Sequence, residues 1–405
     1  MAFLRPLFLR IYPCPTCICD SALVRAKAGD APDCRYPPFL WGKVLQKSLT
    51  QVRLGPHAAV MEILHTTRPS PLVGLDDIPM PSEDAARAQA LVARCPVAAV
   101  TPLHAATAIA TEAGVRDVWI KDERGRMGLG SFKALGAAYV IASDAQEGDI
   151  TARTYVTASA GNHGMSVAAG ATAFGASSVV YIAQTVPETF AARLGEQGAK
   201  VIREGETYEQ SLLAAGKAAE VNGWDLLSDG SWHGYTERPH RLMEGYTVLM
   251  AEAIEQLPEV PTHIFLQAGV GGLACACAAL ARQAWGDGPR IIVVEPEAAA
   301  ALYGSVQAGR AVESTGPVSE MGRLDCKMPS LVALRGLARD ADAFALISES
   351  EGHAGAGLCM VAGLGSSPSG AAGVSALMAL SEAQREELDV TAQSRIFCVL
   401  SEGPA

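Results

Sequence analysis

The chain has 405 residues, of which 49% are hydrophobic and 19% are charged, and its formal net charge is −11. This composition excludes a largely disordered protein, and the excess of acidic residues argues against a nucleic-acid partner. The length allows two domains, each with its own hydrophobic core. We therefore expect a compact globular protein that binds small polar molecules.

Residues 1–65 differ in composition from the rest of the chain. A Cys-Pro-Thr-Cys motif at residues 14–17 follows a short apolar stretch that contains arginine. A zinc site completed by Cys34 and His57 and a short targeting segment are both open, but we favour an irregular or disordered extension. Met61, rather than Met1, is a second candidate for the first residue of the natural protein. Because no convincing cleavable signal precedes the ten scattered cysteines, we expect reduced thiols, no metal site and a cytoplasmic protein.

The remaining chain alternates between predicted strands and helices. Repeated prolines predict an extended segment before a helix that begins near Glu83, with Ser82 as its N-cap, and runs through Val92. Helical patterns follow at residues 168–174 and 242–257, between short apolar runs that predict buried strands. This alternation indicates an α/β fold with parallel sheets and right-handed crossovers. The predicted strands are residues 117–120, 154–158, 178–182, 199–202, 262–266, 290–294 and 395–400.

The longest apolar run, residues 264–281, approaches the length of a membrane span. It contains Gln267 and a cluster of glycines, however, so a strand, a turn and a helix explain it better. We therefore expect no membrane partner.

Lys133 is the first candidate for chemistry. Small residues surround it in Gly-Ser-Phe-Lys-Ala-Leu-Gly, so a flat aromatic ligand has room there, and Glu123 is the nearest acidic residue. One lysine alone is weak support, since most lysines are solvated surface charges. A lysine that binds a carbonyl cofactor covalently also needs a phosphate cradle, a partner for the cofactor's ring nitrogen and a loop for the substrate carboxylate. Candidates for all three follow in the sequence.

Residues 157–164, Thr-Ala-Ser-Ala-Gly-Asn-His-Gly, follow a predicted strand and open a helix. Their backbone N–H groups and the helix dipole favour an anion such as a substrate carboxylate, and the Asn162 amide suits a phenolic oxygen. Simple capping of the helix by Ser159 and Asn162 is an equally good explanation of this segment alone.

Residues 267–274, Gln-Ala-Gly-Val-Gly-Gly-Leu-Ala, also join a strand to a helix. Their glycines allow successive amides to converge on a phosphate, although the lysine of a Walker loop is lacking. Glu295 follows the next strand, at about the 20-residue spacing of a dinucleotide site, so a nicotinamide dehydrogenase is a second hypothesis. Near the chain end, the Ser401 hydroxyl is suited to a pyridine nitrogen, and a simple terminal turn is the alternative.

Taken together, these segments resemble the pyridoxal-phosphate enzymes of the tryptophan synthase β type, known as fold type II, and most resemble the diaminopropionate ammonia-lyases. The similarity runs from about Pro96 to the end of the chain. It includes Lys-Asp-Glu at 121–123, Phe-Lys at 132–133, Gly-Asn-His-Gly at 161–164, Gly-Tyr-Thr at 234–236, the glycine loop, Val-Glu-Pro at 294–296 and Ser-Glu-Gly at 401–403.

The resemblance implies roles for individual residues. Lys133, beside Phe132, is expected to hold the cofactor covalently and to remove the substrate's α-proton. Asn162 would lie beside the ring hydroxyl and Ser401 at the ring nitrogen. The phosphate would be bound by Gly269, Val270, Gly271, Gly272 and Leu273, and the substrate by Ser159, Ala160, Gly161 and His163.

The implied activity is α,β-elimination on a small amino acid during amino-acid breakdown, from 2,3-diaminopropionate to pyruvate and ammonia. A serine, threonine or hydroxyaspartate dehydratase is the alternative, and an inactive relative with a binding or regulatory role is less expected. The resemblance also implies a homodimer. It implies a small domain at residues 149–232, inserted into a large domain formed by residues 66–148 and 233–405.

Two positions bear on the substrate. Ammonia-lyases of this type usually carry an aspartate just before Gly-Asn-His, but this chain has Ala160, as in serine and threonine dehydratases. Asp229 matches a second acidic position of the ammonia-lyases and is a candidate partner for a β-ammonium, with a turn aspartate before Gly230 as the alternative. We therefore predict weak or absent activity on the D-isomer of diaminopropionate.

The remaining histidine and cysteine candidates suggest structural roles. His163 and His233 each stand beside a glycine in a loop, which favours hydrogen bonding over catalysis. Cys275 and Cys277 are two positions apart in a predicted helix, so they point to different faces and do not form a metal pair. Chains of this type usually continue past the Ser-Glu-Gly motif, whereas this sequence ends at Ala405.

Overall fold

The computed structural model describes residues 61–404. The hypotheses of a zinc site or a disordered extension within the first sixty residues lie outside the described residues. No helix in the described part of the chain is both long and apolar enough to cross a membrane.

A seven-stranded sheet has the order β1-β10-β9-β8-β11-β3-β2. Its five inner strands are parallel, and the edge strands β1 and β2 are antiparallel to their neighbours. Four of the inner strands, β8, β9, β10 and β11, are mostly buried apolar residues because helices cover both faces. The strands are β1 (Glu62–His65), β2 (Leu103–Ala105), β3 (Asp117–Asp122), β8 (His263–Gln267), β9 (Arg290–Pro296), β10 (Ala343–Ile347) and β11 (Arg395–Leu400).

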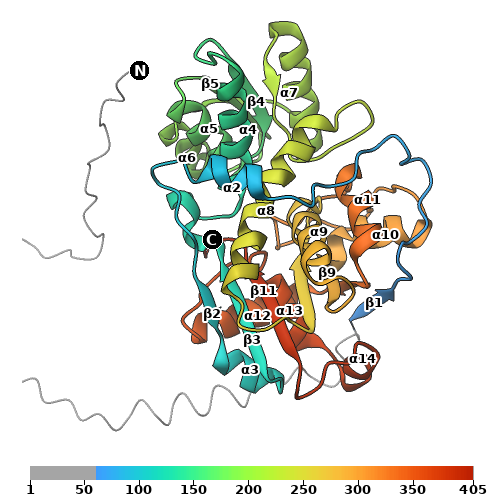
Figure 1. Cartoon of the computed structure of the whole chain (residues 1–405). Helices are drawn as coiled ribbons and strands as arrows, with labels where there is room; N and C mark the ends of the chain where they lie inside the picture. The colour runs from blue at the N-terminus through green and yellow to red at the C-terminus, as the bar shows by residue number, and fades with distance from the viewer. Residues whose placement is uncertain (1–60, 405) are drawn as a thin grey trace, which may run out of the picture. The chain divides into compact units, whose positions relative to one another are not determined.

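A second, four-stranded parallel sheet has the order β6-β5-β4-β7. Its strands are β4 (Thr154–Ala158), β5 (Ser177–Ile182), β6 (Lys200–Arg203) and β7 (Asp225–Leu226). Figure 1 shows this sheet and its helices in green, apart from the seven-stranded sheet. All four strands fall within residues 149–232, the predicted small domain, but the division into two domains remains a prediction.

Helices pack on both faces of the large sheet. One hydrophobic core includes α2, α4, α8, α9 and α11, and the core on the opposite face includes α3, α12 and α13. The helices are α2 (Ala86–Val92), α3 (Thr107–Ala113), α4 (Lys133–Glu147), α5 (Asn162–Ala173), α6 (Glu188–Glu196), α7 (Tyr208–Asn222), α8 (Glu237–Gln256), α9 (Gly272–Trp285), α10 (Ala301–Ala308), α11 (Leu331–Asp340), α12 (Glu349–Val361), α13 (Ala372–Ala379) and α14 (Glu382–Glu387). Two short 3₁₀ helices are η1 (Glu123–Gly128) and η2 (Glu297–Ala299).

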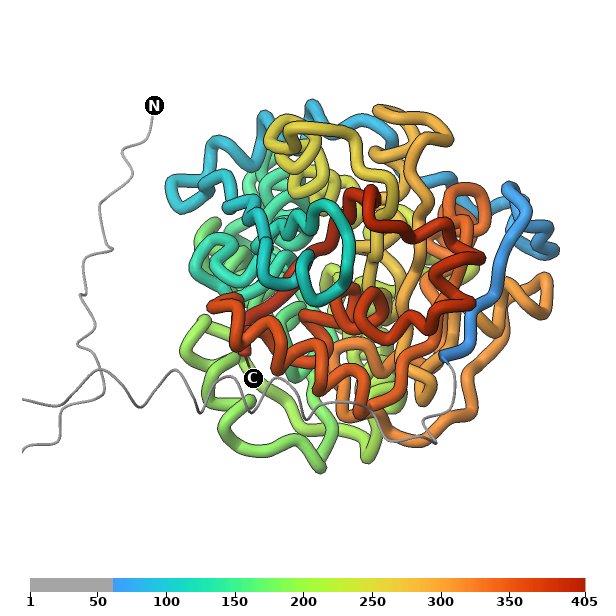
Figure 2. The backbone as a smooth tube through the Cα atoms, turned by 90° about the horizontal axis from the view of Figure 1, so that it is seen from below, coloured from blue at the N-terminus to red at the C-terminus, as the bar shows by residue number. Residues whose placement is uncertain are grey.

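The end of the chain returns to the centre of the large sheet. Strand β11 inserts between β8 and β3, and its residues pair in register with β3 from Arg395 opposite Asp117 to Leu400 opposite Asp122. Figure 2 shows the red C-terminal segment beside the blue-green segment that contains β3. The loop after β11 therefore lies next to the loop that leads to Lys133.

The predicted strands are confirmed with small shifts of their ends, and so is the α/β fold class. The element predictions were incomplete, and one was wrong. The inner strand β10 and the short strands β1, β2 and β7 were not predicted. Helix α2 begins at Ala86, not near Glu83, and Ser82 is not its N-cap. Instead, Asp84 Oδ1 accepts a hydrogen bond from the Ala86 N–H, and this local turn delays the helix.

Candidate active site

Four loops that the sequence marked for chemistry follow the carboxyl ends of parallel strands. The loop to Lys133 follows β3, Ser159 follows β4, the glycine loop follows β8 and Ser401 follows β11. The carboxyl ends of parallel strands are where ligands gather in α/β folds. The topology thus gathers segments that are far apart in the sequence.

The four loops line one cavity of about 310 Å³. Every residue that was predicted for the site contributes to its wall. These residues are Phe132, Lys133, Ser159, Ala160, Gly161, Asn162, His163, Asp229, Gly269, Val270, Gly271, Gly272, Leu273 and Ser401. A shallower hollow, which includes Thr262, Arg290 and Arg395, lies at the amino ends of β8, β9 and β11 and contains none of these motifs.

Lys133 is the first residue of α4 and forms an ion pair inside this cavity. Its Nζ contacts Oδ2 of Asp229, which is 96 positions away in the sequence. Only 20% of the lysine side chain and 14% of the aspartate side chain are exposed. Burial opposes both charges, but their mutual attraction outweighs it, so the pKa of Lys133 is raised and that of Asp229 is lowered. The lysine that has no acidic neighbour in the sequence is therefore paired in the fold.

The Ser159 loop opens helix α5. The N-cap is Gly161, and among the described residues no side chain caps the helix there. The alternative in which Ser159 and Asn162 simply cap α5 is therefore wrong. Ser159 Oγ instead accepts a hydrogen bond from the Gly161 N–H at 3.2 Å, and the Asn162 amide contacts the Glu402 carboxylate. The N-terminus of α5 thus faces the cavity without a capping side chain of its own.

The glycine loop crosses from β8 into α9. Gly271, the N-cap of α9, has φ +99°, and a Cβ there would lie 3.0 Å from both the Ala333 Cβ and the Leu302 Cδ1. Glycine is required for both reasons. The amides at this helix start suit an anion such as a phosphate. Glu295 is directed elsewhere, since its carboxylate accepts hydrogen bonds from the amides of Leu302 and Tyr303, and so the dinucleotide hypothesis is wrong.

Two buried polar atoms in the cavity wall support a polar ligand. Within residues 61–404, Tyr246 Oη and Gln267 Oε1 have no hydrogen-bond partner. Burial raises the pKa of Tyr246 to about 12, which keeps its hydroxyl protonated as a donor. The ring of Phe132 packs edge-on against Tyr246, with ring centroids 4.9 Å apart. A lysine, a helix-start phosphate site and unpaired polar groups fit a phosphorylated, carbonyl-bearing aromatic cofactor.

Several lining residues were missed by the sequence analysis. Tyr208 enters from the first residue of α7, and Tyr246 from the middle of α8. Arg323 and Cys326 come from residues 309–330, a connection between α10 and α11 that contains no helix or strand. A connection longer than about 12 residues is a recognised signal of a functional loop, but nothing in its sequence indicates which residues reach the cavity.

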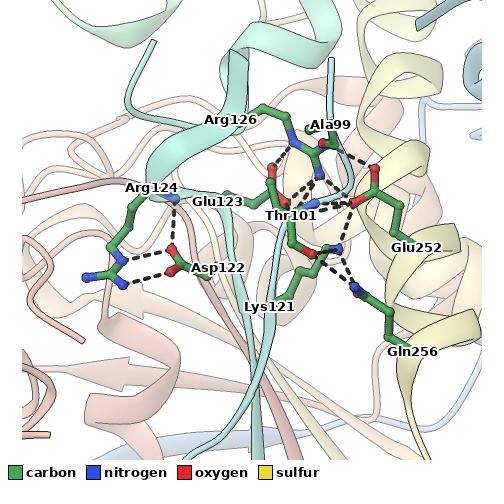
Figure 3. A network of polar contacts seen from close by, with 9 residues as sticks. All are labelled: Ala99, Thr101, Lys121, Asp122, Glu123, Arg124, Arg126, Glu252 and Gln256. Carbon is green, nitrogen blue, oxygen red and sulfur yellow. Dashed lines mark hydrogen bonds and ion pairs between the residues drawn. The ribbon is translucent and has the colours of Figure 1, made fainter. Parts of the chain in front are cut away.

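A buried network of charges supports the loop that leads to Lys133. Arg126 of η1 donates hydrogen bonds to two carboxylates, those of Glu123 in η1 and Glu252 in α8 (Figure 3). The Lys121 Nζ lies 2.7 Å from Glu252 Oε2. Two cations thus balance two carboxylates. Burial opposes ionisation of Glu252, but the hydrogen bond from Arg126 holds its pKa below the ordinary value. The network fastens η1 to α8 just before Lys133.

The other histidine and cysteine candidates have structural surroundings. His163 is buried, its Nε2 lies 2.8 Å from the Leu227 carbonyl oxygen, and burial lowers its pKa. His233 lies on the surface beside Asp77. Cys275 and Cys277 are both buried in α9. In the part of the chain that the structure describes, no cluster of three or more His, Cys, Asp or Glu side chains is placed to bind a metal.

The sequence is similar to those of known proteins. Diaminopropionate ammonia-lyase of Salmonella typhimurium is 34% identical over 268 residues, which cover 59% of this chain and 66% of that protein. The L-serine dehydratase/L-threonine deaminase of Mus musculus is 32% identical over 215 residues, which cover 52% of this chain and 62% of that protein. The chain therefore matches slightly less than two thirds of the length of these curated relatives.

A solved structure extends the comparison. Diaminopropionate ammonia-lyase from Escherichia coli, in complex with an aminoacrylate–PLP azomethine reaction intermediate, matches with a TM-score of 0.77 and 27% identity over 85% of this chain and 94% of that one. A model of the family described as pyridoxal-phosphate dependent enzymes matches residues 96–402. The chain therefore belongs to the pyridoxal-phosphate dependent enzyme family, with pyridoxal phosphate as its cofactor.

Proposed function

We propose that this protein eliminates the β-amine of 2,3-diaminopropionate as ammonia and releases aminoacrylate, which water hydrolyses to pyruvate and a second ammonia. The observation that carries the proposal is the Asp229 carboxylate, which faces the Lys133 amine inside the cavity. A carboxylate there can bind the second ammonium group that distinguishes diaminopropionate from serine and threonine. The similarity to two diaminopropionate ammonia-lyases supports the same substrate.

The cavity has a residue for each part of the cofactor. In this proposal Lys133 binds it covalently, and the amides of residues 269–273 at the start of α9 bind its phosphate. Asn162 would lie beside the ring hydroxyl and Ser401 beside the ring nitrogen. Bound there, pyridoxal phosphate supplies an electron sink for the loss of the substrate's α-proton.

Lys133 and Asp229 act together on the substrate. In the cofactor-free protein the pairing with Asp229 raises the pKa of Lys133. In the proposal, the α-amine of the substrate would displace Lys133 from the cofactor and so free the lysine amine. A substrate β-ammonium that takes over the Asp229 carboxylate would then remove the stabilisation of the charged amine, so its pKa would fall and Lys133 could accept the α-proton. The N-terminus of α5, from Ser159 to Asn162, holds the substrate carboxylate. In this arrangement substrate binding itself prepares the base.

A dehydratase that acts on serine, threonine or hydroxyaspartate is the second candidate. Ala160 lines the cavity where ammonia-lyases of this type usually carry an aspartate. Ala160 itself offers no acidic group to meet an amine or to take a proton. The similarity to a serine dehydratase supports this candidate.

We also propose that the protein is a cytoplasmic homodimer and that residues 149–232 form a small domain. Both proposals rest on the resemblance described above.

Pyruvate release tests the proposal. The purified, cofactor-loaded protein would be assayed with L- and D-diaminopropionate, L-serine, L-threonine and hydroxyaspartate. We expect the highest kcat/KM with L-diaminopropionate and little or no pyruvate from the D-isomer. Faster turnover of a hydroxy amino acid would favour the dehydratase, and robust turnover of the D-isomer would refute the predicted stereochemistry. A loaded protein that releases no pyruvate from any of them would instead be an inactive relative.

A further inference from the structure

Arg323 brings a positive charge to the cavity wall from the connection between α10 and α11. Its guanidinium lies directly over Gly161, because a Cβ at that glycine would meet Nη1 at 2.8 Å. The guanidinium carbon also lies 5.6 Å from the centre of the Phe190 ring, on α6. With 36% of its side chain exposed, Arg323 is held at the cavity mouth and is still accessible to a ligand.

A cation is unfavourable at this position unless an anion accompanies it. Gly161 is the N-cap of α5, and the N-terminus of a helix carries a partial positive charge that repels a guanidinium. The one carboxylate in contact among the described residues is Glu402, whose Oε2 is 3.5 Å from Arg323 Nε. Glu402 is already engaged by the Asn162 amide and the Ser367 hydroxyl.

The hydrogen-bonding capacity of the guanidinium is largely unused. Within residues 61–404 its side-chain nitrogens make this one ion contact and no hydrogen bond, whereas the Arg323 backbone N–H donates to Ser369 Oγ. Guanidinium groups bind carboxylates through two parallel N–H donors, which adds geometric selectivity to the charge. Arg323 and the start of α5 therefore converge on a position that suits a carboxylate.

We propose that Arg323 is a substrate-binding residue that binds a carboxylate of the amino-acid substrate over Gly161. The inference rests on the proposed function only in that it takes the cavity as an amino-acid site. The carboxylate is either the α-carboxylate, shared by all candidate substrates, or a β-carboxylate, as in hydroxyaspartate. Arg323 brings a positive charge next to Ala160, which disfavours a substrate ammonium close to the guanidinium and favours a carboxylate there.

The test measures binding of amino acids that have no β-leaving group. Isothermal titration calorimetry on the cofactor-loaded protein would use L-alanine, L-aspartate and L-alaninamide, which lacks the carboxylate. The variants are Arg323→Gln, which removes the charge, and Arg323→Lys, which keeps it. Arg193→Gln is the matched control, because Arg193 is exposed on α6, the helix that carries Phe190. Thermal melting checks that each variant is folded.

We expect Arg323→Gln to weaken carboxylate binding by about tenfold or more, with Arg323→Lys between it and the wild type. A loss for both alanine and aspartate assigns the α-carboxylate, and a loss for aspartate alone assigns a β-carboxylate. Alaninamide binding should stay unchanged in every variant, and Arg193→Gln should resemble the wild type.

Three results would overturn the inference: unchanged affinities in Arg323→Gln, an equal loss for alaninamide, or a wild-type protein that binds none of the amino acids. The pyruvate assay is independent of these titrations. A protein that releases no pyruvate but loses alanine affinity on Arg323→Gln would refute the proposed elimination and leave the role of Arg323 intact.

Discussion

At the scale of single residues, the ion pair between Lys133 and Asp229 dominates the electrostatics of the cavity. Each group has lost most of its contact with water, and each keeps its charge because of the other. An ionised pair of this kind stabilises the fold only while both groups stay charged. Its contribution therefore depends on pH in a direction that the pKa shifts define.

The variant Asp229→Asn tests this pair in the cofactor-free protein. The pKa of Asp229 is depressed from its ordinary value of 3.8, so the stabilisation is present above that pH and is lost as the pH falls through the depressed pKa. The raised pKa of Lys133 means that no loss occurs below its ordinary value of 10.5. We expect the wild type to be more stable than the variant near neutral pH and the difference to shrink below about pH 4.

Urea unfolding at a series of pH values measures this difference. Asp76→Asn is the matched control, because Asp76 is exposed, and its difference from the wild type should be small at every pH. A wild-type advantage over Asp229→Asn that stays constant down to pH 3 or so would contradict the ion pair. The unfolded-state carboxyl has its ordinary pKa of 3.8 and takes up a proton in this range, whereas the paired carboxyl of the folded state stays ionised, so unfolding of the wild type must become easier.

The sequence predicted the residues of local motifs, and it could not predict the residues that tertiary structure brings to them. Lys133, Asn162 and Ser401 stand in short segments whose chemistry is recognisable. Arg323 and Tyr208 occur in no such segment, and they line the cavity only because a long connection and the start of α7 pass over it. The pairing of Lys133 with Asp229 escaped prediction for the same reason.

At the scale of elements, we propose that the glycine loop and the start of α9 form one site for the cofactor phosphate. Gly271→Ala would place a side chain at φ +99°, which costs about 1–3 kcal/mol, and its Cβ would press on Ala333 and Leu302. We expect the loop to shift and the affinity for pyridoxal phosphate to fall by about tenfold or more.

Equilibrium titration of cofactor absorbance measures this effect. Gly216→Ala is the control, because Gly216 lies within α7, where an added Cβ would meet no other atom within 4 Å and alanine favours the helix. Its cofactor affinity should equal that of the wild type. If Gly271→Ala bound the cofactor as tightly as Gly216→Ala does, the glycine loop would not be the phosphate site.

The buried charge network joins η1 to α8, and Glu252 is its shared acceptor. Glu252→Gln would leave Lys121 and Arg126 with one carboxylate between them in a buried setting. Breaking a buried pair costs about 3–5 kcal/mol, so we expect a large fall in the urea midpoint. Glu255→Gln is the control, because Glu255 lies three residues further along α8 and is exposed, and it should change stability by less than about 0.5 kcal/mol. Equal midpoints for the two variants would show that the network does not stabilise the fold.

Strands with a strong β-branched pattern were predicted closely, as β4 and β11 show. Strand β10, Ala-Phe-Ala-Leu-Ile, was missed because it contains two alanines and a leucine, which favour helix, and only one β-branched residue. Burial between β1 and β9 overrides this local preference. Helix α2 was predicted to begin too early because serine is a common N-cap residue and Ser82 stands before the helical pattern. In the structure, the Asp84 side chain instead forms a local turn by accepting a hydrogen bond from the Ala86 N–H.

At the scale of the whole molecule, polar contacts in the cavity join the surroundings of the two sheets. Lys133 and Glu402 follow strands of the large sheet, and their partners Asp229 and Asn162 follow strands of the small sheet. A cofactor held by residues from both sheets stabilises the native state by mass action, by about 2.7 kcal/mol at a hundredfold excess over Kd.

We therefore expect pyridoxal phosphate to raise the temperature of thermal unfolding, and pyridoxal, which lacks the phosphate, to raise it much less at the same concentration. Differential scanning fluorimetry of the cofactor-free protein compares the two ligands. Equal shifts would contradict the role of the α9 N-terminus, because the phosphate would then add nothing to binding.

The central claim, that Lys133 anchors the cofactor in this cavity, is tested most directly by reduction and peptide mapping. Sodium borohydride would fix the cofactor of the loaded protein to its lysine, and mass spectrometry of the tryptic peptides would locate it. We predict the cofactor-derived mass on Lys133. Its appearance on another lysine, such as Lys121 or Lys327, or on no lysine of a protein that has bound the cofactor, would contradict the account.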